Sequence, residues 1–297
     1  MALKQGSSQS TAVLLALSSV LCWSFAATSF KKALEAHSPW FVVFSGSVVS
    51  AVVLLVILLA RGKRVSPSDA RRGVLYGFLN PFLYYLVLLH AYDGLPAQIA
   101  MVVNYLWPVV LVLLAVPFLG HKLTRGGFAG VFLSFSGVAV MALMGRSSMR
   151  IELIPLGLAF LSTVVWAVYW LLNTRSTGDT NAVLLMSFTY GSIYLGLAGA
   201  ITGQAFTPAP SALPWLVYIG VFEMGVTYIM WNTALKKAES TASVGGLIFL
   251  TPFLALIPIA LIVGEGIAPS TITGLVLVTA GILLEKRFRH RAERLGD

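Results

Sequence analysis

The chain has 297 residues, of which 58% are hydrophobic and only 10% are charged. A soluble domain carries about 25% charged residues, so this composition excludes an ordinary water-soluble fold. The net charge is +9, and the single cysteine, Cys22, rules out an intrachain disulfide. A transmembrane helix needs about 20 apolar residues, so ten such helices would leave no room for a separate soluble catalytic domain.

Ten apolar stretches follow one another along the chain, separated by polar residues or by Gly and Pro. They cover residues 11–30, 40–60, 73–91, 97–117, 126–145, 154–173, 181–202, 213–234, 241–263 and 268–285. Only helices and closed barrels satisfy the backbone in lipid, and these stretches lack strand-like alternation and are too long for barrel strands. The sequence therefore predicts an all-α membrane protein with ten transmembrane helices.

Lys and Arg are distributed unequally between the two sides of the predicted membrane. Sixteen fall on the side of the N-terminus: Lys4, Arg61, Lys63, Arg64, Arg71, Arg72, Lys122, Arg125, Arg175, Lys236, Lys237, Lys286, Arg287, Arg289, Arg291 and Arg294. Four fall on the other side: Lys31, Lys32, Arg146 and Arg150. Basic residues are enriched in cytoplasmic loops, so we expect both termini in the cytoplasm. Because these clusters flank membrane helices, we expect no nucleic-acid partner.

The two halves of the chain match each other when one is shifted by 143 or 144 residues. A shift of 143 aligns Ser19 with Ser162, Trp23 with Trp166, Gly77 with Gly220, Tyr85 with Tyr228, and Ala91 with Ala234. A shift of 144 aligns Pro108 with Pro252, Gly120 with Gly264, Gly130 with Gly274, and Gly137 with Gly281. Residues 1–148 and 149–297 are therefore predicted to be two five-helix repeats, the second inverted because five is odd. Inverted repeats are typical of secondary transporters, whose substrate site lies near the midplane.

A set of short motifs recurs in both halves of the chain. The second half contains Ala234 to Ser243, Thr251-Pro252-Phe253, Gly264-Glu265, and then Gly274 and Gly281. The first half contains Ala91, Gly94-Leu95-Pro96-Ala97, Trp107-Pro108 and Leu119-Gly120-His121-Lys122-Leu123. These motifs resemble the EamA repeat of the drug/metabolite transporter superfamily, although His121 stands where a glutamate is usual. Within that superfamily the chain is most similar to bacterial inner-membrane amino-acid exporters, including the aromatic amino-acid type.

The resemblance implies a ten-helix bundle in which spans 1–4 and 6–9 line a central cavity while spans 5 and 10 brace it. The partners it implies are a small-molecule substrate and the lipid bilayer, and a monomer is one compatible oligomeric state. No cofactor is implied.

Several kinds of catalytic or energy-coupling motif are missing from the sequence. It contains no glycine-rich phosphate loop ending in Lys-Ser or Lys-Thr, so an ATP-driven pump is not predicted. The four aspartates, Asp69, Asp93, Asp179 and Asp297, fall in loops, near span ends or in the tail, and the four histidines are isolated. Neither an enzyme nor a metal site is therefore expected.

Glu223 is the only acidic residue near the centre of a predicted span. A charge at that depth costs at least ~2.5 kcal/mol, and such residues are functional by default. We interpret Glu223 as a proton carrier or as a group that faces a substrate amine. The alternative is a protonated, hydrogen-bonded packing residue. The repeat mate of Glu223 is Asn80, which precedes Pro81 in span 3.

Aromatic and amide side chains recur at helical spacing along several spans. Helical spacing groups Glu223 with Thr227, and Asn80 with Tyr84. The predicted substrate-binding residues are Glu223, Asn80, Tyr84, Asn104, Trp23, Trp166, Tyr169 and Tyr228. Packing, or location at the membrane interface, is the alternative for each aromatic residue.

Proline and glycine residues within the spans have separate predicted roles. Pro108 and Pro252 are repeat mates that interrupt their helices, so paired gating kinks are predicted, with static kinks as the alternative. The pair Gly73 and Gly77, and the pair Gly126 and Gly130, are predicted to allow close helix contact.

The sequence favours an inner-membrane secondary transporter that exports small metabolites, above all amino acids, by alternating access. Drug-like or nucleotide-sugar substrates remain an alternative, because a fold does not determine a function. A channel-like pore is another alternative, which would lack saturation and counterflow.

Overall fold

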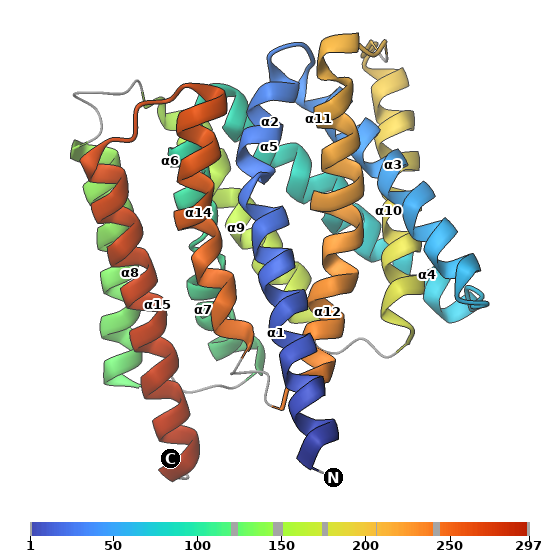
Figure 1. Ribbon diagram of the computed structural model, residues 1–297. Helices are drawn as coiled ribbons and strands as arrows, with labels where there is room; N and C mark the ends of the chain where they lie inside the picture. The colour runs from blue at the N-terminus through green and yellow to red at the C-terminus, as the bar shows by residue number, and fades with distance from the viewer. Residues whose placement is uncertain are drawn as a thin grey trace. The chain divides into compact units, whose positions relative to one another are not determined.

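The computed structural model describes residues 2–119, 124–144, 151–173, 178–205, 207–239 and 244–295, with side chains for residues 9–118 and 124–288 within those ranges (Figure 1). All regular structure in these ranges is helical. Several residues of the sequence motifs and basic loops lie outside the described residues: Gly120, His121, Lys122, Leu123, Arg146, Arg150, Arg175 and Ser240 to Ser243.

Within the described ranges, nine helical segments are long and apolar enough to cross a membrane. They are Gln9–Leu34, Pro39–Ala60, Pro67–Gly94, Ala97–Phe118, Arg125–Met144, Leu153–Asn173, Thr180–Ile201, Pro210–Lys237 and Gly246–Val263. The tenth predicted span, 268–285, lies almost wholly in α15 (Pro269–Leu295). The chain is therefore an all-α, multi-pass membrane protein, which confirms the fold class predicted from composition.

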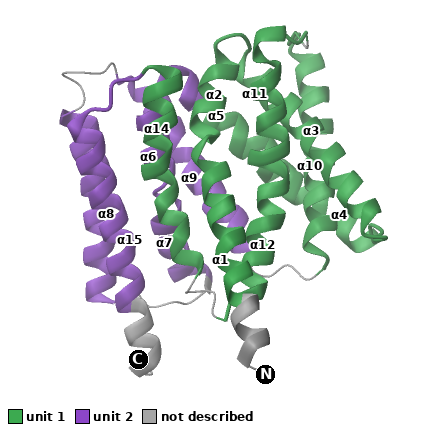
Figure 2. Cartoon of the chain, in the orientation of Figure 1, with its two compact units in different colours: residues 1–89, 177–264 green, residues 90–176, 265–297 purple. Residues whose placement is uncertain are grey.

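Two compact units divide the chain, and each is assembled from segments far apart in the sequence (Figure 2). Unit 1 comprises residues 1–89 and 177–264, and unit 2 comprises residues 90–176 and 265–297. The elements of unit 1 are α1 (Ala2–Ser24), α2 (Ala26–Leu34), α3 (Pro39–Ala60), α4 (Pro67–Gly77), η1 (Phe78–Leu83), α10 (Thr180–Ile201), η3 (Pro210–Ala212), α11 (Leu213–Tyr218), η4 (Ile219–Val226), α12 (Thr227–Lys237), η5 (Gly246–Leu250), α14 (Thr251–Pro258) and η6 (Ile259–Val263). The elements of unit 2 are α6 (Ala97–Asn104), α7 (Trp107–Leu119), α8 (Arg125–Met144), α9 (Leu153–Asn173) and α15. Helix α5 (Tyr84–Gly94) begins in unit 1 and ends in unit 2.

Three helices of unit 1 begin at capping side chains that satisfy their first backbone N–H groups. Ser38 caps α3, and Ser66 caps α4 in a reciprocal capping box with Asp69. Asp179 caps α10 by accepting from two backbone N–H groups, at 2.9 and 3.3 Å, and it also pairs with Lys63. Partial burial raises the pKa of Asp179, but these hydrogen bonds and the Lys63 charge outweigh burial and hold the pKa below its ordinary value.

Small residues let the helices of unit 1 approach closely. A Cβ at Gly77 would lie 2.5 Å from the Ser187 carbonyl oxygen, and one at Gly73 would lie 2.4 Å from the Met186 Cβ. These contacts confirm the close approach predicted for Gly73 and Gly77. Because Gly73 meets residue 186 while Gly77 meets residues 187 to 191, α4 and α10 run parallel, as expected for spans 3 and 7.

Unit 2 is braced by the contact between α8 and α15. A Cβ at Gly137 would lie 2.6 Å from the Gly274 carbonyl oxygen, and one at Gly130 would lie 2.6 Å from the Gly281 carbonyl oxygen. The partner number falls as the residue number rises, so the two helices are antiparallel. Ser134, between the two glycines of α8, donates to the Val278 carbonyl oxygen at 3.1 Å. This geometry is the one expected for spans 5 and 10 of an inverted repeat.

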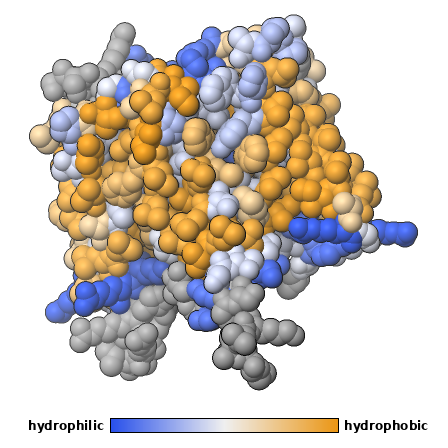
Figure 3. All heavy atoms as spheres, viewed as in Figure 1, coloured by the Kyte–Doolittle hydropathy of each residue, from blue (hydrophilic) through white to orange (hydrophobic). Residues whose placement is uncertain are grey.

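Large apolar side chains cover the outer faces of the helices in both units (Figure 3). On α3, Val52 is 56% exposed and Leu59 is 63% exposed, and on α8, Phe132 is 68% exposed. Such faces would be a liability in water, whereas in a bilayer they meet lipid tails. A buried ionisable or amide side chain is costly in such a setting, so candidate sites are sought among the buried polar residues.

Candidate functional site

Two helix interruptions stand at matching points of the predicted repeats. Asn80 lies in η1 and Glu223 lies in η4, and both elements are π-helical. Asn80 has φ −146° and ψ 113°, which lies outside the helical region, so the backbone is broken there. Segments of π-helix occur frequently at functional sites. The predicted helical spacing from Asn80 to Tyr84 does not apply across this break, because the intervening residues do not follow an α-helix.

Glu223 is 92% buried at the centre of a hydrogen-bonded cluster in unit 1, since only 8% of its surface is exposed. The Tyr85 hydroxyl donates to Glu223 Oε1 at 3.0 Å, while Glu223 Oε2 has no hydrogen-bond partner among the described residues. The Tyr85 and Tyr228 hydroxyl oxygens lie 3.3 Å apart. Because Tyr85 has one proton and gives it to Glu223, Tyr228 donates to Tyr85. The cluster thus holds one carboxylate oxygen free for a further partner.

Aromatic rings pack around this carboxylate. The Trp23 indole N–H donates to the Glu223 backbone carbonyl at 3.3 Å. Its ring meets Tyr228 edge-on, with centroids 5.7 Å apart, and meets Trp231 at the same distance. Tyr84 packs on Tyr85 with centroids 4.8 Å apart. We call Trp23, Tyr84, Tyr85, Glu223, Tyr228 and Trp231 the Glu223 cluster; it brings together four of the predicted site residues, namely Trp23, Tyr84, Glu223 and Tyr228.

Tyr85 was not among the predicted site residues, although it makes the direct contact with Glu223. The repeat itself carried the missed signal, since Tyr85 and Tyr228 are mates at an offset of 143 residues. An inverted repeat places mates symmetrically, and mates near the symmetry axis can touch each other. Helical spacing favoured Tyr84 instead, because that spacing assumed an unbroken helix through Asn80.

Asn80 lies in the same unit but makes no hydrogen bond to the Glu223 cluster. Its side chain is fully buried, and neither its nitrogen nor its oxygen has a hydrogen-bond partner among the described residues. The adjacent Pro81 ring contacts Gly191 of α10 so closely that a Cβ there would lie 2.4 Å from it. A buried amide with no partner is costly and is found where a ligand, a water or a second conformation can satisfy it.

The remaining predicted binding residues form a separate group in unit 2. Asn104 donates to Ser162 Oγ at 3.0 Å, and Ser162 donates to the Ala159 carbonyl oxygen at 2.6 Å. The Trp166 and Tyr169 rings stack at 5.1 Å with an interplanar angle of 9°. Trp107 and Trp170, which are not among the predicted binding residues, extend the aromatic group, and the Trp170 indole N–H has no partner among the described residues. The predicted residues therefore divide into an acidic group and an aromatic-amide group.

Pro108 and Pro252 occupy equivalent places in the two repeats. Helix α6 ends at Asn104, and Pro108 is the second residue of α7. Pro252 is likewise the second residue of α14, after the 3₁₀ turn of η5. Proline is tolerated in the first turn of a helix, where its missing N–H has no intrahelical acceptor. Both prolines therefore mark interruptions, as their spacing predicts, and their gating role stays a prediction.

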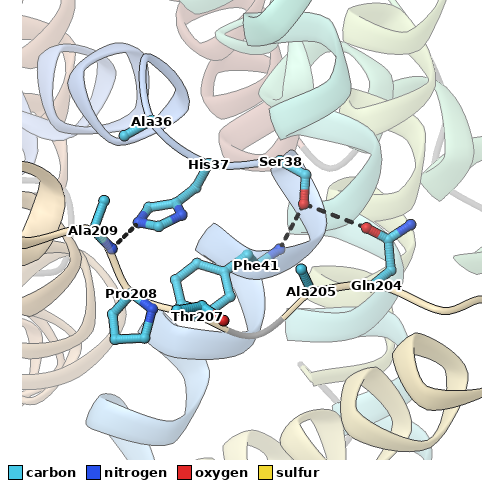
Figure 4. Close-up of a pocket in the computed structure, with 9 residues that line it drawn as sticks. All are labelled: Ala36, His37, Ser38, Phe41, Gln204, Ala205, Thr207, Pro208 and Ala209. Atoms are coloured by element: carbon cyan, nitrogen blue, oxygen red, sulfur yellow. Dashed lines mark hydrogen bonds between the residues drawn. The ribbon is translucent and has the colours of Figure 1, made fainter.

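A pocket of about 530 Å³ lies in unit 1 at the loops that follow α2 and α10 (Figure 4). His37 Nε2 accepts a hydrogen bond from the Ala209 backbone N–H at 3.1 Å, and Ser38 Oγ lies 3.4 Å from Gln204 Oε1. Burial lowers the pKa of His37, which favours the neutral ring that this acceptor role requires. None of the predicted binding residues line this pocket.

The described residues contain no group of three or more His, Cys, Asp or Glu side chains that could hold a metal ion. The chemistry available at the Glu223 cluster is therefore that of a carboxylate, phenol hydroxyls and aromatic faces. Such a set binds and releases a small polar or cationic group.

Comparison with known families decides which class of protein carries this fold. Residues 10–143 and 153–285 each match the EamA-like transporter family. The chain belongs to this family. One relative is a probable terminal-alkyne amino-acid exporter of Streptantibioticus cattleyicolor, 28% identical, with 94% of each chain covered. Another is the aromatic amino acid exporter YddG of Ancylobacter novellus, 26% identical over 89% of this chain and 92% of the relative.

Other relatives differ in the substrate that they are named for. The biotin transporter of Salmonella typhimurium is 25% identical, with 93% of each chain covered. A solved crystal structure matches with a TM-score of 0.67 at 20% identity, covering 96% of this chain and 99% of that chain. At that identity the match concerns the fold alone. This EamA-family chain is therefore a multi-pass membrane transporter of small molecules.

Proposed function

We propose that this EamA-family protein is an inner-membrane secondary transporter that exports amino acids, including aromatic ones, by alternating access. The observation that carries the proposal is the Glu223 cluster, in which a carboxylate with one unpartnered oxygen lies among aromatic rings inside an interrupted helix. A buried ionisable group in a span is expensive and is retained for function. Two relatives named as amino-acid exporters support this substrate class.

The proposal includes an organisation into two inverted five-helix repeats, residues 1–148 and 149–297, with both termini in the cytoplasm. The two family matches at 10–143 and 153–285 support this division. The parallel packing of α4 with α10 and the antiparallel packing of α8 with α15 also support it. The unequal distribution of Lys and Arg supports the orientation.

Within this proposal, the candidate binding residues of each unit are considered by themselves. In unit 1, the polar end of a substrate and the substrate atoms next to it would be bound by Glu223, Asn80, Tyr84, Trp23 and Tyr228. In unit 2, Asn104, Trp166 and Tyr169 would offer an aromatic face and an amide. Pro108 and Pro252 would serve as the flexible points that accompany alternating access.

Counterflow in proteoliposomes tests the proposal. Vesicles are loaded with unlabelled phenylalanine at pH 7, and uptake of external labelled phenylalanine is followed. A transient accumulation above equilibrium is the expected result, because a carrier exchanges one bound molecule for another. Equilibration without overshoot would contradict a carrier and favour a pore. Overshoot only with drug-like compounds or nucleotide sugars would contradict the amino-acid assignment.

A matched pair of variants ties the activity to the site. Glu223→Gln should slow exchange, whereas Glu35→Gln makes the same chemical change outside the span, where Glu35 is 55% exposed and pairs with Lys32 at 2.6 Å. Equal rates for both variants and the wild type would remove Glu223 from the transport mechanism.

A further inference from the structure

Near the centres of the described spans, acidic and basic side chains are not equally represented. Within the nine described spans, Lys and Arg lie only within a few residues of a span end, and Glu223 is the only acid near the centre of one of these spans. A transported molecule that reaches the middle of unit 1 therefore meets a carboxylate and no basic side chain. A substrate that itself carries a positive charge would complement this carboxylate.

Hydrogen bonding within the Glu223 cluster also favours a positively charged substrate group. Tyr85 gives its proton to Glu223 Oε1, and Tyr228 gives its proton to Tyr85. Both phenol protons are thus used inside the cluster, which leaves Glu223 Oε2 and oxygen lone pairs as acceptors. An ammonium group has three donors and no acceptor, so it matches such a site, whereas a carboxylate has acceptors only.

The aromatic rings supply a second element of ammonium recognition. Trp23 lies against Glu223 through its indole N–H and meets Tyr228 and Trp231 at 5.7 Å between ring centroids. Faces of Trp and Tyr attract cations, and the attraction is strongest where water is excluded. Here Tyr228 is 7% exposed and Trp231 is 9% exposed. A carboxylate enclosed by aromatic side chains is therefore suited to a primary or substituted ammonium ion.

We propose that the Glu223 cluster recognises the ammonium group of the substrate alone, so that the protein also transports apolar amines without a carboxylate, such as aromatic monoamines. This inference rests on the proposed transport function and narrows its substrate class. The buried side-chain donors left without a partner in the described part of the chain are neutral and include Asn80 Nδ2 and Trp170 Nε1. A substrate carboxylate thus gains no charged partner, and its desolvation is not compensated. Removing that carboxylate should cost no transport, whereas masking the ammonium should abolish it.

Three ligands that share a phenyl ring separate these requirements. Counterflow is measured at pH 7 with phenethylamine, phenylalanine and N-acetylphenylalanine, and protein-free vesicles correct for passive diffusion of the neutral amine. Phenethylamine should exchange at least as fast as phenylalanine. N-acetylphenylalanine should exchange at least about tenfold more slowly, the loss expected when a hydrogen bond to a charged group is removed.

Variants then test whether Glu223 is the responsible group. Glu223→Gln should lose phenethylamine exchange by at least about tenfold, Glu223→Asp should retain part of it, and Glu35→Gln should match the wild type. Tyr85→Phe removes the donor to Oε1 without changing the charge, and it should lower the apparent affinity for the amine. If Glu223→Gln does not fold, the ranking of the three ligands in the wild-type protein still decides the question.

The outcomes distinguish this inference from the function on which it rests. Overshoot with phenylalanine but none with phenethylamine would overturn ammonium-only recognition and leave amino-acid export standing. Equal exchange of N-acetylphenylalanine would overturn it as well. Absence of overshoot with both phenylalanine and phenethylamine would overturn the proposed function together with the inference.

Discussion

Units 1 and 2 of this transporter differ in how they satisfy buried polar groups. In unit 1, Glu223 Oε2 and both polar atoms of Asn80 are buried without a hydrogen-bond partner among the described residues, and the helices are interrupted at both residues. In the described part of unit 2, the Trp170 indole N–H is the one buried side-chain group without such a partner, whereas the Asn104 amide is bonded to Ser162 and the Gln98 side chain is bonded to Gly266, Ala268 and Thr271. Unsatisfied polar groups are costly, so their concentration in unit 1 indicates where function, not stability, selected the residues.

The close packing of α8 on α15, which we call the brace, is the feature of unit 2 that contributes to stability. Its glycines allow backbone contact over two helical turns, and Ser134 is fully hydrogen-bonded between them. Packing of this kind stabilises a membrane helix pair without a hydrophobic driving force. The comparison therefore predicts that substitutions in the Glu223 cluster change transport, whereas substitutions in the brace change stability.

The largest effect on transport is expected for Glu223→Gln. The change keeps the shape of the side chain but removes the only acidic group near the centre of a described span, so the counterflow rate with phenylalanine should fall at least about tenfold. The apparent melting temperature in detergent should not fall, because the variant no longer buries an ionisable group. Loss of both transport and stability would instead assign Glu223 to packing and break the comparison.

Gly137→Leu should have the largest effect on stability. Its Cβ would lie 2.6 Å from the Gly274 carbonyl oxygen, so the helices must separate, at a cost of roughly 1–3 kcal/mol. Unfolding in a denaturing detergent measures the loss. Gly157→Leu is the control, since a Cβ there meets nothing within 4 Å. If both variants unfold alike, close packing of α8 on α15 does not stabilise unit 2.

Glu265→Gln should lower the free energy of unfolding by about 1 kcal/mol, because a carboxylate at a helix N-terminus interacts favourably with the first N–H groups and with the helix dipole. Glu265 accepts from the Ala97 N–H at 2.6 Å and from the Gln98 N–H at 3.3 Å at the start of α6. The thermal midpoint should fall while the exchange rate per folded molecule stays constant. A changed exchange rate at an unchanged midpoint would show that this motif glutamate acts in transport.

The smallest effect concerns pH and Asp179. Its pKa lies below the ordinary value of 3.8 in the folded chain, so its stabilising contribution is present above that value and is lost as the pH falls through the folded pKa. The side chain is 30% exposed, so the contribution is less than about 1 kcal/mol. The free energy of unfolding of the wild type should exceed that of Asp179→Asn at pH 7, and the difference should shrink as the pH falls below 3.8. A difference that does not change with pH would contradict this origin.

Local sequence signals predicted much of the fold and only part of the candidate site. Apolar runs located the spans, and Gly73 and Gly77 were correctly interpreted as contact residues. Glu223 could be identified from the sequence because it is a single acidic residue within an apolar stretch. Tyr85 was missed, although the repeat aligned it with Tyr228, because helical spacing across Asn80 assumed regular geometry.

The sequence by itself determined that this protein lies in a membrane and to which class of protein it belongs. The length of the apolar stretches, the positions of the charged residues and the internal repeat can all be read from the unfolded chain. Only the tertiary structure decided that Tyr85 donates to Glu223 from 138 residues away, and that Asn104 is satisfied while Asn80 is not. Hydrogen-bond partners distant in the sequence depend on how helices pack. That packing is set by close contacts such as those of Gly77 and Gly137, not by the periodicity of any one segment.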